Sequence, residues 1–333
     1  MRSLLITAAL ALTSCATVGP IAEAPTCGVS VEDRAWIDAS LDAWRFSARE
    51  ITGVATVRPF EAVFFDDDCV LTSPNAFTAE QVADVIWAAT AHAGEIPLPN
   101  GDVMPAGVAS FASADEAGAF FVMATPNVWR EAGVRNDALG LEAMMTAVLL
   151  HEGAHVAQSS THGARISALV PANNLSDDFN DDSIQERFGD NPEFAASVER
   201  ETDLLFQAVA SRDQATARRL ISEARELMRA RRARWFTGAD AYLSEAEDLW
   251  LTFEGAGQWV GFQWLVHPSG GGLETEIVMA NFAQRGRWWS QKEGIALAFA
   301  VDRLARFDWK RQAFGDGAMN LTQMLDASLA NEE

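Results

Sequence analysis

One short pattern constrains this chain more than any other feature: residues 151–155 read H-E-G-A-H and directly follow the apolar run 144–150. Asn136 or Asp137 can cap a helix that carries this run and ends near Gln158. Residues four apart in a helix lie one turn apart on the same face, so both histidines of the pattern point the same way. We therefore expect a largely buried helix that presents two imidazoles side by side.

The residue types in this pattern are those of a metal site. At this spacing His151 and His155 can bind one Zn²⁺, and Glu152 between them can reach a water on the metal. We predict one zinc ion per chain, with Glu152 as the catalytic general base. The alternative is a pair of helix-surface histidines beside a solvated glutamate. The pattern resembles the H-E-x-x-H helix of zinc metallopeptidases, and this resemblance implies hydrolysis of peptide bonds.

The third metal ligand separates the groups of such peptidases. One group continues the pattern as H-E-x-x-H-x-x-G-x-x-H. Here Gln158 occupies the glycine position, Thr161 occupies the histidine position, and His162 lies one residue late. The chain is more similar to the thermolysin-like group, the Glu-zincins (gluzincins), in which a glutamate from a second helix completes the site.

Glu254 is the first choice for that glutamate. It lies in the segment 251–259, which resembles a Glu-Gly-x-Ala-x-aromatic segment of several Glu-zincin families, including bacterial collagenases. Gly257 replaces the alanine of that segment, and Trp259 supplies an aromatic ring. The resemblance therefore implies that the metal ligands are His151, His155 and Glu254.

Small residues on both helices favour this choice. Residues 255–257 and 153–154 carry little side-chain bulk, so two helices could approach closely there, as a Zn–O bond of about 2 Å requires. Each glycine in mid-helix costs roughly 1 kcal/mol, so something should compensate for it. Glu247 lies two turns before Glu254 and could orient a metal-bound histidine.

Other acidic residues compete for the third position. The Glu199-x-x-x-Asp203 spacing resembles another zincin group, in which the glutamate binds zinc and the aspartate holds a histidine. Glu199 and Glu201 are therefore rivals to Glu254, although a solvated helix face explains this polar segment equally well. Glu293 in a later helix is a more distant third.

The N-terminus has the composition of an export signal. Arg2 precedes the apolar run 4–12, and small residues follow. The segment 12–15 resembles a bacterial lipobox, which implies a signal peptide at 1–14, lipidation of Cys15 and an N-terminal tether at 15–30. The alternative is an ordinary signal peptide that is cut further on.

This resemblance implies a location as well. Ala16 after the lipidated cysteine favours a periplasm-facing outer-membrane lipoprotein over retention at the inner membrane. A soluble periplasmic or secreted protein is the alternative. Once Cys15 is set aside, Cys27 and Cys69 remain, and an oxidising compartment favours a disulfide between them over two buried thiols.

The charge of the chain excludes one class of partner. The formal net charge is −22, so no basic surface is expected for nucleic acid. No internal apolar stretch is long enough to span a bilayer, and contact with a membrane is expected only through the N-terminal lipid. A peptide or protein substrate is the partner that the zincin resemblance implies.

The pattern of elements predicts an α+β fold that is mainly α. We expect a single zincin-like unit over 31–330, with a β-containing half at 31–135 and a helical half at 136–330. Thr78 and Gln81 form a capping box for a helix to residue 87. The ranges of the other expected helices are 31–51, 136–158, 192–210, 213–236, 239–266, 288–307 and 319–329. Strands are expected at 54–65 and 117–124, with a loop at 94–107.

Two segments are expected to border the site. In thermolysin-like peptidases a strand shortly before the metal helix forms the upper rim of the cleft and pairs with extended substrate. Residues 117–124 could be that strand, or a plain core strand. The acidic stretch 176–182 is expected to form a solvated flap, because it lacks the glycine and final glutamate of a calcium loop.

The function that we expect is that of a zinc metallopeptidase. Two alternatives stay open: a non-catalytic envelope lipoprotein that keeps the zincin fold as a binding or assembly module, and a zinc hydrolase of a non-peptide amide. The group that would stabilise the oxyanion is left unassigned, because Tyr242 and His267 lie far along the helix from Glu254.

Overall fold

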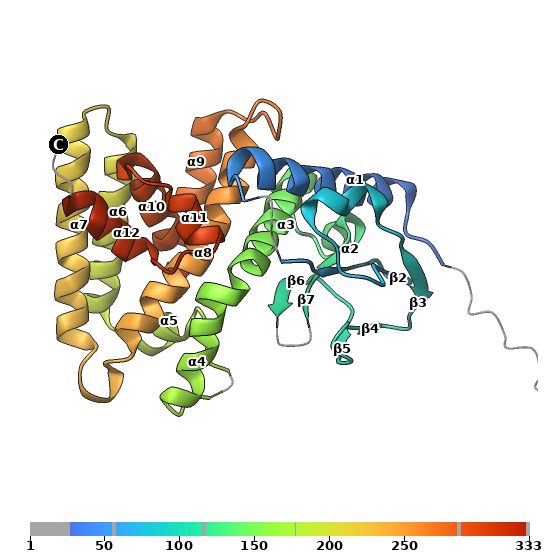
Figure 1. Ribbon diagram of the computed structural model, residues 1–333, viewed down its shortest axis with the longest axis horizontal. Coiled ribbons are helices and arrows are strands. Elements are labelled where there is room, and N and C mark those ends of the chain that lie inside the picture. The colour runs from blue at the N-terminus through green and yellow to red at the C-terminus, as the bar shows by residue number, and fades with distance from the viewer. Residues whose placement is uncertain (1–26, 55–57, 115–117, 177, 285–287, 331–333) are drawn as a thin grey trace, which may run out of the picture.

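The computed structural model describes residues 27–54, 58–114, 118–176, 178–284 and 288–330. The predicted signal segment and Cys15 lie outside this part of the chain. The predicted fold class is confirmed: the described chain is α+β and mainly α (Figure 1). A small sheet and a large group of helices lie on opposite sides of the helix that carries the H-E-x-x-H pattern.

The N-terminal half contains the strands. Its elements are α1 (Val31–Phe46), a π-helical turn (Ser47–Ile51), β1 (Glu61–Phe65), β2 (Cys69–Thr72), a 3-10 helix (Ala79–Asp84), β3 (Ala88–Ala91), β4 (Glu95–Pro97), β5 (Val103–Pro105), β6 (Ser110–Ala114), β7 (Ala119–Ala124) and α2 (Pro126–Glu131). Five strands form one sheet in the order β3-β2-β1-β7-β6, in which only β1 and β7 run parallel. β4 and β5 form a separate hairpin.

The central strands are apolar on both faces because both faces are covered. Successive side chains of a strand point to opposite sides, so Phe64 and Phe121 belong to the large core shared with α1 and the helix that carries the H-E-x-x-H pattern. Val63 and Val122 belong to a second cluster on the other face, which Ile96 of the β4–β5 hairpin helps to close. The sheet therefore separates two buried hydrophobic clusters.

Several local predictions in this half were wrong. The first strand begins at Glu61 and not at residue 54, and the capping box starts a 3-10 helix that ends at Asp84. Gln81 accepts from the backbone N–H of Thr78 at 3.0 Å as expected, but Val85 is extended with ψ 121°, as suits a β-branched residue. The predicted loop 94–107 contains the β4–β5 hairpin.

The C-terminal half is helical. Its elements are α3 (Leu141–Gln158), a π-helical turn (Ser159–Gly163), α4 (Ala164–Ala172), α5 (Ser183–Phe188), α6 (Pro192–Ala210), α7 (Gln214–Trp235), a 3-10 turn (Gly238–Asp240), α8 (Leu243–Val266), α9 (Thr275–Gln284), α10 (Trp289–Leu304), α11 (Trp309–Phe314) and α12 (Leu321–Ala330). α6 begins as its sequence predicts, because the Asn191 side chain accepts from two N–H groups of the first turn and Pro192 follows it.

Helix α3 begins later than predicted. Neither Asn136 nor Asp137 caps it, since the residue before Leu141 is Gly140 with φ 79°. Asn136 instead accepts from the N–H of Leu139 at 3.0 Å through its side chain, and from the N–H of Gly140 at 2.8 Å through its carbonyl. This closes a turn before the helix, and the glycine allows the positive φ at the entry.

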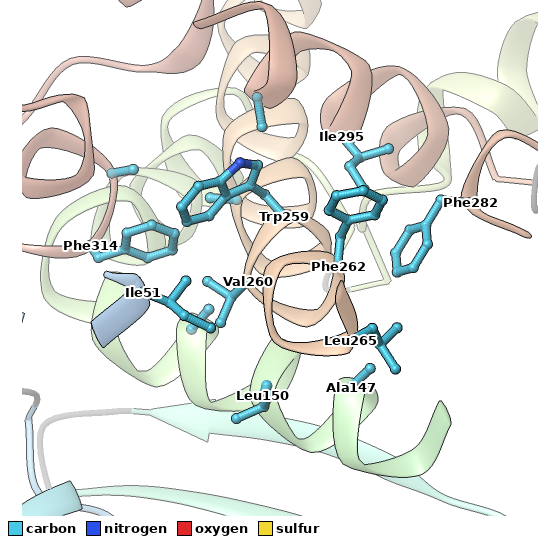
Figure 2. Packing of buried hydrophobic residues seen from close by; sticks show 14 of the residues in the cluster. Ile51, Ala147, Leu150, Trp259, Val260, Phe262, Leu265, Phe282, Ile295 and Phe314 are labelled. Carbon is cyan, nitrogen blue, oxygen red and sulfur yellow. The ribbon is translucent and has the colours of Figure 1, made fainter. Parts of the chain in front are cut away.

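Helix α8 packs against both α3 and α10 (Figure 2). Gly261 allows the first contact, since a methyl group there would lie 3.0 Å from the carbonyl oxygen of Ala147. Gly255 allows the second, since a methyl group there would lie 2.3 Å from the backbone of Gly294. The small residues therefore serve two helix contacts and not the single one that was predicted.

Gly153 has another neighbour than expected. A methyl group at this position would lie 3.0 Å from the indole of Trp44, so Gly153 makes room for α1 and not for α8. Trp44 belongs to the same buried cluster as the sheet and α3. The glycine of the H-E-x-x-H pattern thus allows close contact between α3 and the N-terminal half of the fold.

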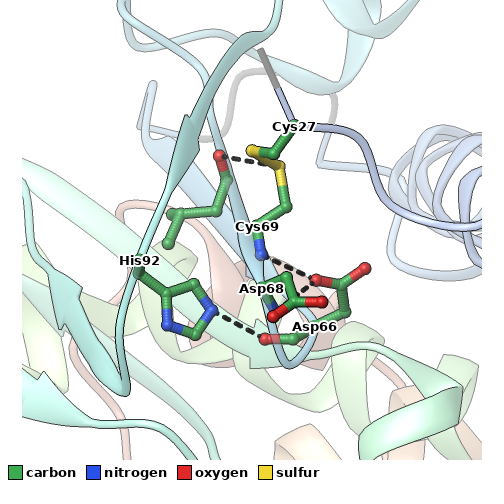
Figure 3. Close-up of a disulfide and its surroundings, with 6 residues drawn as sticks. Cys27, Asp66, Asp68, Cys69 and His92 are labelled. Carbon is green, nitrogen blue, oxygen red and sulfur yellow. Dashed lines mark hydrogen bonds between the residues drawn. A yellow bond between two sulfur atoms is a disulfide. The ribbon is translucent and has the colours of Figure 1, made fainter. Parts of the chain in front are cut away.

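The predicted cysteine pair is joined by a disulfide. Cys27 and Cys69 have an S–S distance of 2.13 Å and fasten the segment before α1 to β2 (Figure 3). The Asp66 side chain accepts from the N–H of Cys69 at 2.8 Å, which shapes the turn between β1 and β2. Within the part of the chain that the structure describes, no helix combines the length and the apolarity that a membrane span requires.

Candidate metal centre

Three side chains predicted as metal ligands converge between α3 and α8. Nε2 of His151 lies 3.3 Å from Oε2 of Glu254, and Nε2 of His155 lies 3.3 Å from Oε1 of the same carboxylate. The donor atoms of the three residues all lie within 4.8 Å of one another. Two imidazoles and one carboxylate could therefore hold a metal ion, and three protein donors leave a coordination position open for a further ligand.

The three side chains are almost completely buried, with 8%, 9% and 6% exposure for His151, His155 and Glu254. Burial alone would raise the pKa of Glu254, but the two imidazoles outweigh it and hold this pKa well below its usual range. Burial alone would lower the pKa of His151, yet the Glu254 carboxylate raises it above its ordinary value. The buried charge of Glu254 is thus stabilised by positive charge on its neighbours.

Packing sets the orientation of the two imidazole rings. Within the described residues, Nδ1 of His151 and Nδ1 of His155 are buried without a hydrogen-bond partner. The His155 ring stacks on Phe253, with ring centres 4.0 Å apart and an interplanar angle of 5°. The His151 ring lies against Gly257, where a methyl group would come within 2.7 Å of Nδ1. Gly257 is therefore the small residue that admits the imidazole.

Glu247 does not have the role predicted for it. Its carboxylate accepts from Nη1 of Arg231 at 2.7 Å and from Nε of Arg232 at 2.6 Å. Since these bonds engage both of its oxygens, Glu247 belongs to a buried ionic cluster in the first half of α8. It orients neither histidine.

The rivals for the third ligand position lie elsewhere. Glu201 is buried and its Oε2 accepts from Nη2 of Arg231 at 2.8 Å, while Glu199 is exposed on α6. Glu293 is buried in α10 near the same arginine, at 3.9 Å, and burial together with Glu201 raises its pKa well above the usual range. Within the described residues, none of the three lies in the His–His–Glu cluster.

Glu152, the predicted general base, has one partner that the sequence did not indicate. Its Oε1 accepts from the hydroxyl of Ser110 at 3.0 Å, and Ser110 is the first residue of β6. Glu152 is 7% exposed. A hydroxyl in the short, weakly patterned segment Ser110–Ala114 gave no signal of this contact, because the pairing joins residues 42 positions apart.

Asp181 is a second residue that the sequence did not single out. It lies in the acidic stretch expected to be a solvated flap, but the Ser290 hydroxyl of α10 bonds to its Oδ2 at 3.0 Å. Burial and the charge of Glu254 raise its pKa. The stretch is therefore only partly a solvated flap, because Asp178 and Asn180 are exposed whereas Asp181 is turned toward the protein.

No protein-family model, no curated protein and no solved structure matches this chain. The resemblance to zinc peptidases therefore stands on the motif and on the geometry of its side chains.

A cleft opens beside the metal centre. A hollow of about 530 Å³ is bordered by His155, Phe253 and β6. The predicted rim strand, here β7, is an inner strand that pairs with β1 and β6, so it is a core strand. The outermost described strand on this side is β6. The edge of the sheet beside the candidate metal centre is therefore β6, and no described strand pairs with its outer side.

Proposed function

We propose that this protein is a zinc-dependent metallopeptidase of the Glu-zincin type. The observation that carries the proposal is the convergence of His151, His155 and Glu254 within 4.8 Å, on two helices that meet at Gly257 and Gly261. Two imidazoles with one carboxylate are a ligand set of catalytic zinc sites. Sites built only from oxygen ligands suit magnesium or calcium better, so this donor set favours zinc.

The residues around the centre suit the hydrolysis of an amide. When bound, zinc would polarise a carbonyl group and lower the pKa of a water molecule. Glu152 would accept the proton of the attacking water and pass it to the leaving amine. Ser110 holds one oxygen of that carboxylate at 3.0 Å, which leaves the other oxygen for the proton.

A peptide is the amide that the cleft favours. An extended peptide can add to an exposed sheet edge through main-chain hydrogen bonds, and β6 presents such an edge beside His155. A small non-peptide amide would not use this edge. A non-catalytic binding module would use it as well, so turnover is the property that separates these functions.

We further propose that the protein acts in the bacterial envelope as a lipoprotein anchored through Cys15. Support comes from the order of residues at the N-terminus and from the Cys27–Cys69 disulfide, since disulfides persist in oxidising compartments. Mass spectrometry of the mature protein would find an acylated cysteine at its N-terminus. An unmodified N-terminus beyond residue 15 would contradict the anchor.

The substitution Glu152→Gln tests the proposed activity. It should leave bound zinc unchanged, because the three ligands remain, and lower peptide turnover by about 100-fold or more. Glu142→Gln is the matched control, since Glu142 lies on the same helix in an exposed pair with Arg130. Zinc content and cleavage of a peptide library would be measured on all three proteins. Equal turnover by the Glu152 variant and the wild type would refute the mechanism.

A further inference from the structure

A small hollow lies one turn of α8 away from Glu254. Its volume is about 20 Å³, and it is lined by residues of α5, α6, α8 and α10 and by Asp181 before α5. Trp250 and Leu251 are the residues of α8 that lie three and four positions before Glu254, on the same face of the helix. A hollow of this volume has room for one water molecule.

Two polar atoms of the lining have no hydrogen-bond partner among the described residues: Oε1 of Glu293 and Nε1 of Trp250. Both atoms are buried, and Glu293 as a whole is only 1% exposed. Buried polar groups in folded proteins almost always have a partner, and an internal water supplies it where no side chain can reach. The indole N–H is a donor to such a water, and the carboxyl group of Glu293 can bond to it as well.

A second carboxyl group borders the same hollow. Asp181 accepts a hydrogen bond from the Ser290 hydroxyl at 3.0 Å, and both residues line the hollow. Glu247 lines it too, but both of its oxygens already accept from arginines of α7. Because the space has the size of one water molecule, a water bound to Glu293 also lies beside Asp181. The two acids are thus linked across the hollow.

The protonation state of Glu293 decides how it binds such a water. Its charged neighbours belong to three helices: Glu201 of α6, Arg231 and Arg232 of α7, and Glu247 of α8. Burial and the charge of Glu201 outweigh the arginines and raise the pKa of Glu293 well above its usual range. Glu293 therefore keeps its proton under conditions in which exposed carboxyl groups are ionised, and it can donate a hydrogen bond.

Asp181 carries this link to the metal centre. Its carboxyl group is close enough to interact electrostatically with His155 and Glu254, and it acts on His151 in the same way. Burial and Glu254 disfavour the ionised form of Asp181. Hydrogen bonds donated to its oxygens favour the ionised form. A carboxylate at this place attracts a cation toward the three candidate ligands, and the loss of such an outer group typically costs 10–100-fold in metal affinity.

We propose that the hollow binds a water molecule that joins the protonated Glu293 to Asp181, and that Glu293 is through this water a positioning residue for the metal centre. The water accepts from the Glu293 carboxyl and from the Trp250 indole, and it donates to Asp181. The Asp181 carboxylate is thereby held as an anion near the candidate ligands, where it strengthens metal binding. The inference rests on the proposed zinc site and extends it beyond the three ligands.

A crystal structure of the metal-free protein tests the water directly. We expect density for one water within about 3.2 Å of Oε1 of Glu293, Nε1 of Trp250 and a carboxylate oxygen of Asp181. Glu293→Gln should keep this water, because a neutral amide can also donate to it. Glu293→Met, with an unbranched apolar side chain, should lose it. A wild-type structure without a water at this place would overturn the inference.

Zinc affinity tests the positioning role. Competition with a chelating dye would give the Kd for zinc of each variant. We expect Asp181→Asn and Glu293→Met to weaken zinc binding by about tenfold, and Glu293→Gln to bind almost as tightly as the wild type. The double variant Asp181→Asn, Glu293→Met should be no weaker than Asp181→Asn, because both changes break one link. Glu186→Met is the control, since Glu186 lies exposed on the neighbouring α5.

The contrary outcomes are distinct. Losses that add in the double variant, or a Glu293→Gln protein that binds zinc as weakly as Glu293→Met, would overturn the positioning role. Zinc affinities as expected in a protein that cleaves no peptide would refute the peptidase and support this inference. A wild type that binds no zinc would refute the metal centre and the positioning role together, and the crystal structure alone would then decide the water site.

Discussion

Glu254 and the two histidines form a centre whose side chains depend on one another's charge. A buried carboxylate beside neutral imidazoles is costly, so the Glu254 carboxylate favours the protonated form of His151. The raised pKa of His151 and the lowered pKa of Glu254 express this arrangement. At the scale of single residues, a proton and a bound metal ion would therefore compete for the same atoms.

This competition predicts a pH dependence with a definite sign. The raised pKa of His151 gives stability that is present below its ordinary value of 6.5 and is lost as the pH rises through the raised pKa. The lowered pKa of Glu254 gives stability that is present above its ordinary value of 4.5 and is lost as the pH falls through the lowered pKa. Without metal, the cluster should stabilise the protein most between these two values.

Bound zinc should stabilise the protein more as the pH rises, whereas the stability that comes from the proton on His151 falls. Because zinc must displace the proton of His151, the rise in Tm that it causes should grow as the pH increases from about 5 to 8. Thermal melts with and without zinc would measure it, with Glu254→Gln as the variant that should show almost no rise. A zinc effect that is constant over this pH range would contradict the assignment.

Ser110 permits a second prediction at the same scale. Ser110→Ala removes the hydroxyl that holds Glu152, and a hydrogen bond to a charged group is worth about 1.5 kcal/mol, close to a tenfold change in rate. We expect kcat to fall about tenfold, KM to stay nearly constant, and Ser110→Thr to restore most of the rate. Steady-state kinetics on a cleaved peptide would decide. A loss in KM alone would mean that β6 serves only binding.

Helix α8 is fixed at its first half by a buried ionic cluster and at its second half by glycine contacts. Arg231 is fully buried between Glu201 at 2.8 Å and Glu247 at 2.7 Å. Gly257 and Gly261 then bring the same helix against α3. At the scale of elements, this double attachment places Glu254 opposite the two histidines.

Substitution of the cluster arginine should destabilise the fold. Arg231→Met leaves the buried carboxylate of Glu201 without its cation and leaves Glu247 with Arg232 alone, and breaking a buried pair in this way costs about 3–5 kcal/mol. Arg219→Met is the matched control, because Arg219 forms an exposed pair with Glu223 on the same helix and should matter by less than about 1 kcal/mol. Urea unfolding would compare the two. A similar small effect of both would show that the cluster does not hold α8.

The sequence predicted the elements with strong patterns and missed those with weak ones. The helix of the H-E-x-x-H pattern and the helix of Glu254 were predictable because long apolar periodicity and a spaced motif coincide in each. The start of α3 was not, because the turn that Asn136 closes competes with its capping role. β6 was missed because S-F-A-S-A has neither β-branched residues nor a clear alternation.

At the scale of the whole molecule, the cleft is lined by residues of β6 and of the helices α3, α4 and α8, and α3 lies between the sheet and the helical half (Figure 1). Its lining draws on segments far apart in sequence, such as Arg58, Ile166 and Trp250. No local pattern links these residues, so their meeting could not be predicted. The sequence alone also could not decide whether Glu254 or Glu201 is the third candidate ligand. That depends on a tertiary contact, because Arg231 of α7 binds Glu201.

Zinc content measured by elemental analysis decides whether His151, His155 and Glu254 form a metal site. Purified protein would be reconstituted with zinc and dialysed, as wild type, as Glu254→Ala and as Glu199→Ala, whose lost side chain lies exposed on α6. We expect about one zinc per chain in the wild type and in Glu199→Ala, and a large loss in Glu254→Ala. A wild type that holds no zinc, or a Glu254→Ala protein that holds as much as the wild type, would contradict this expectation.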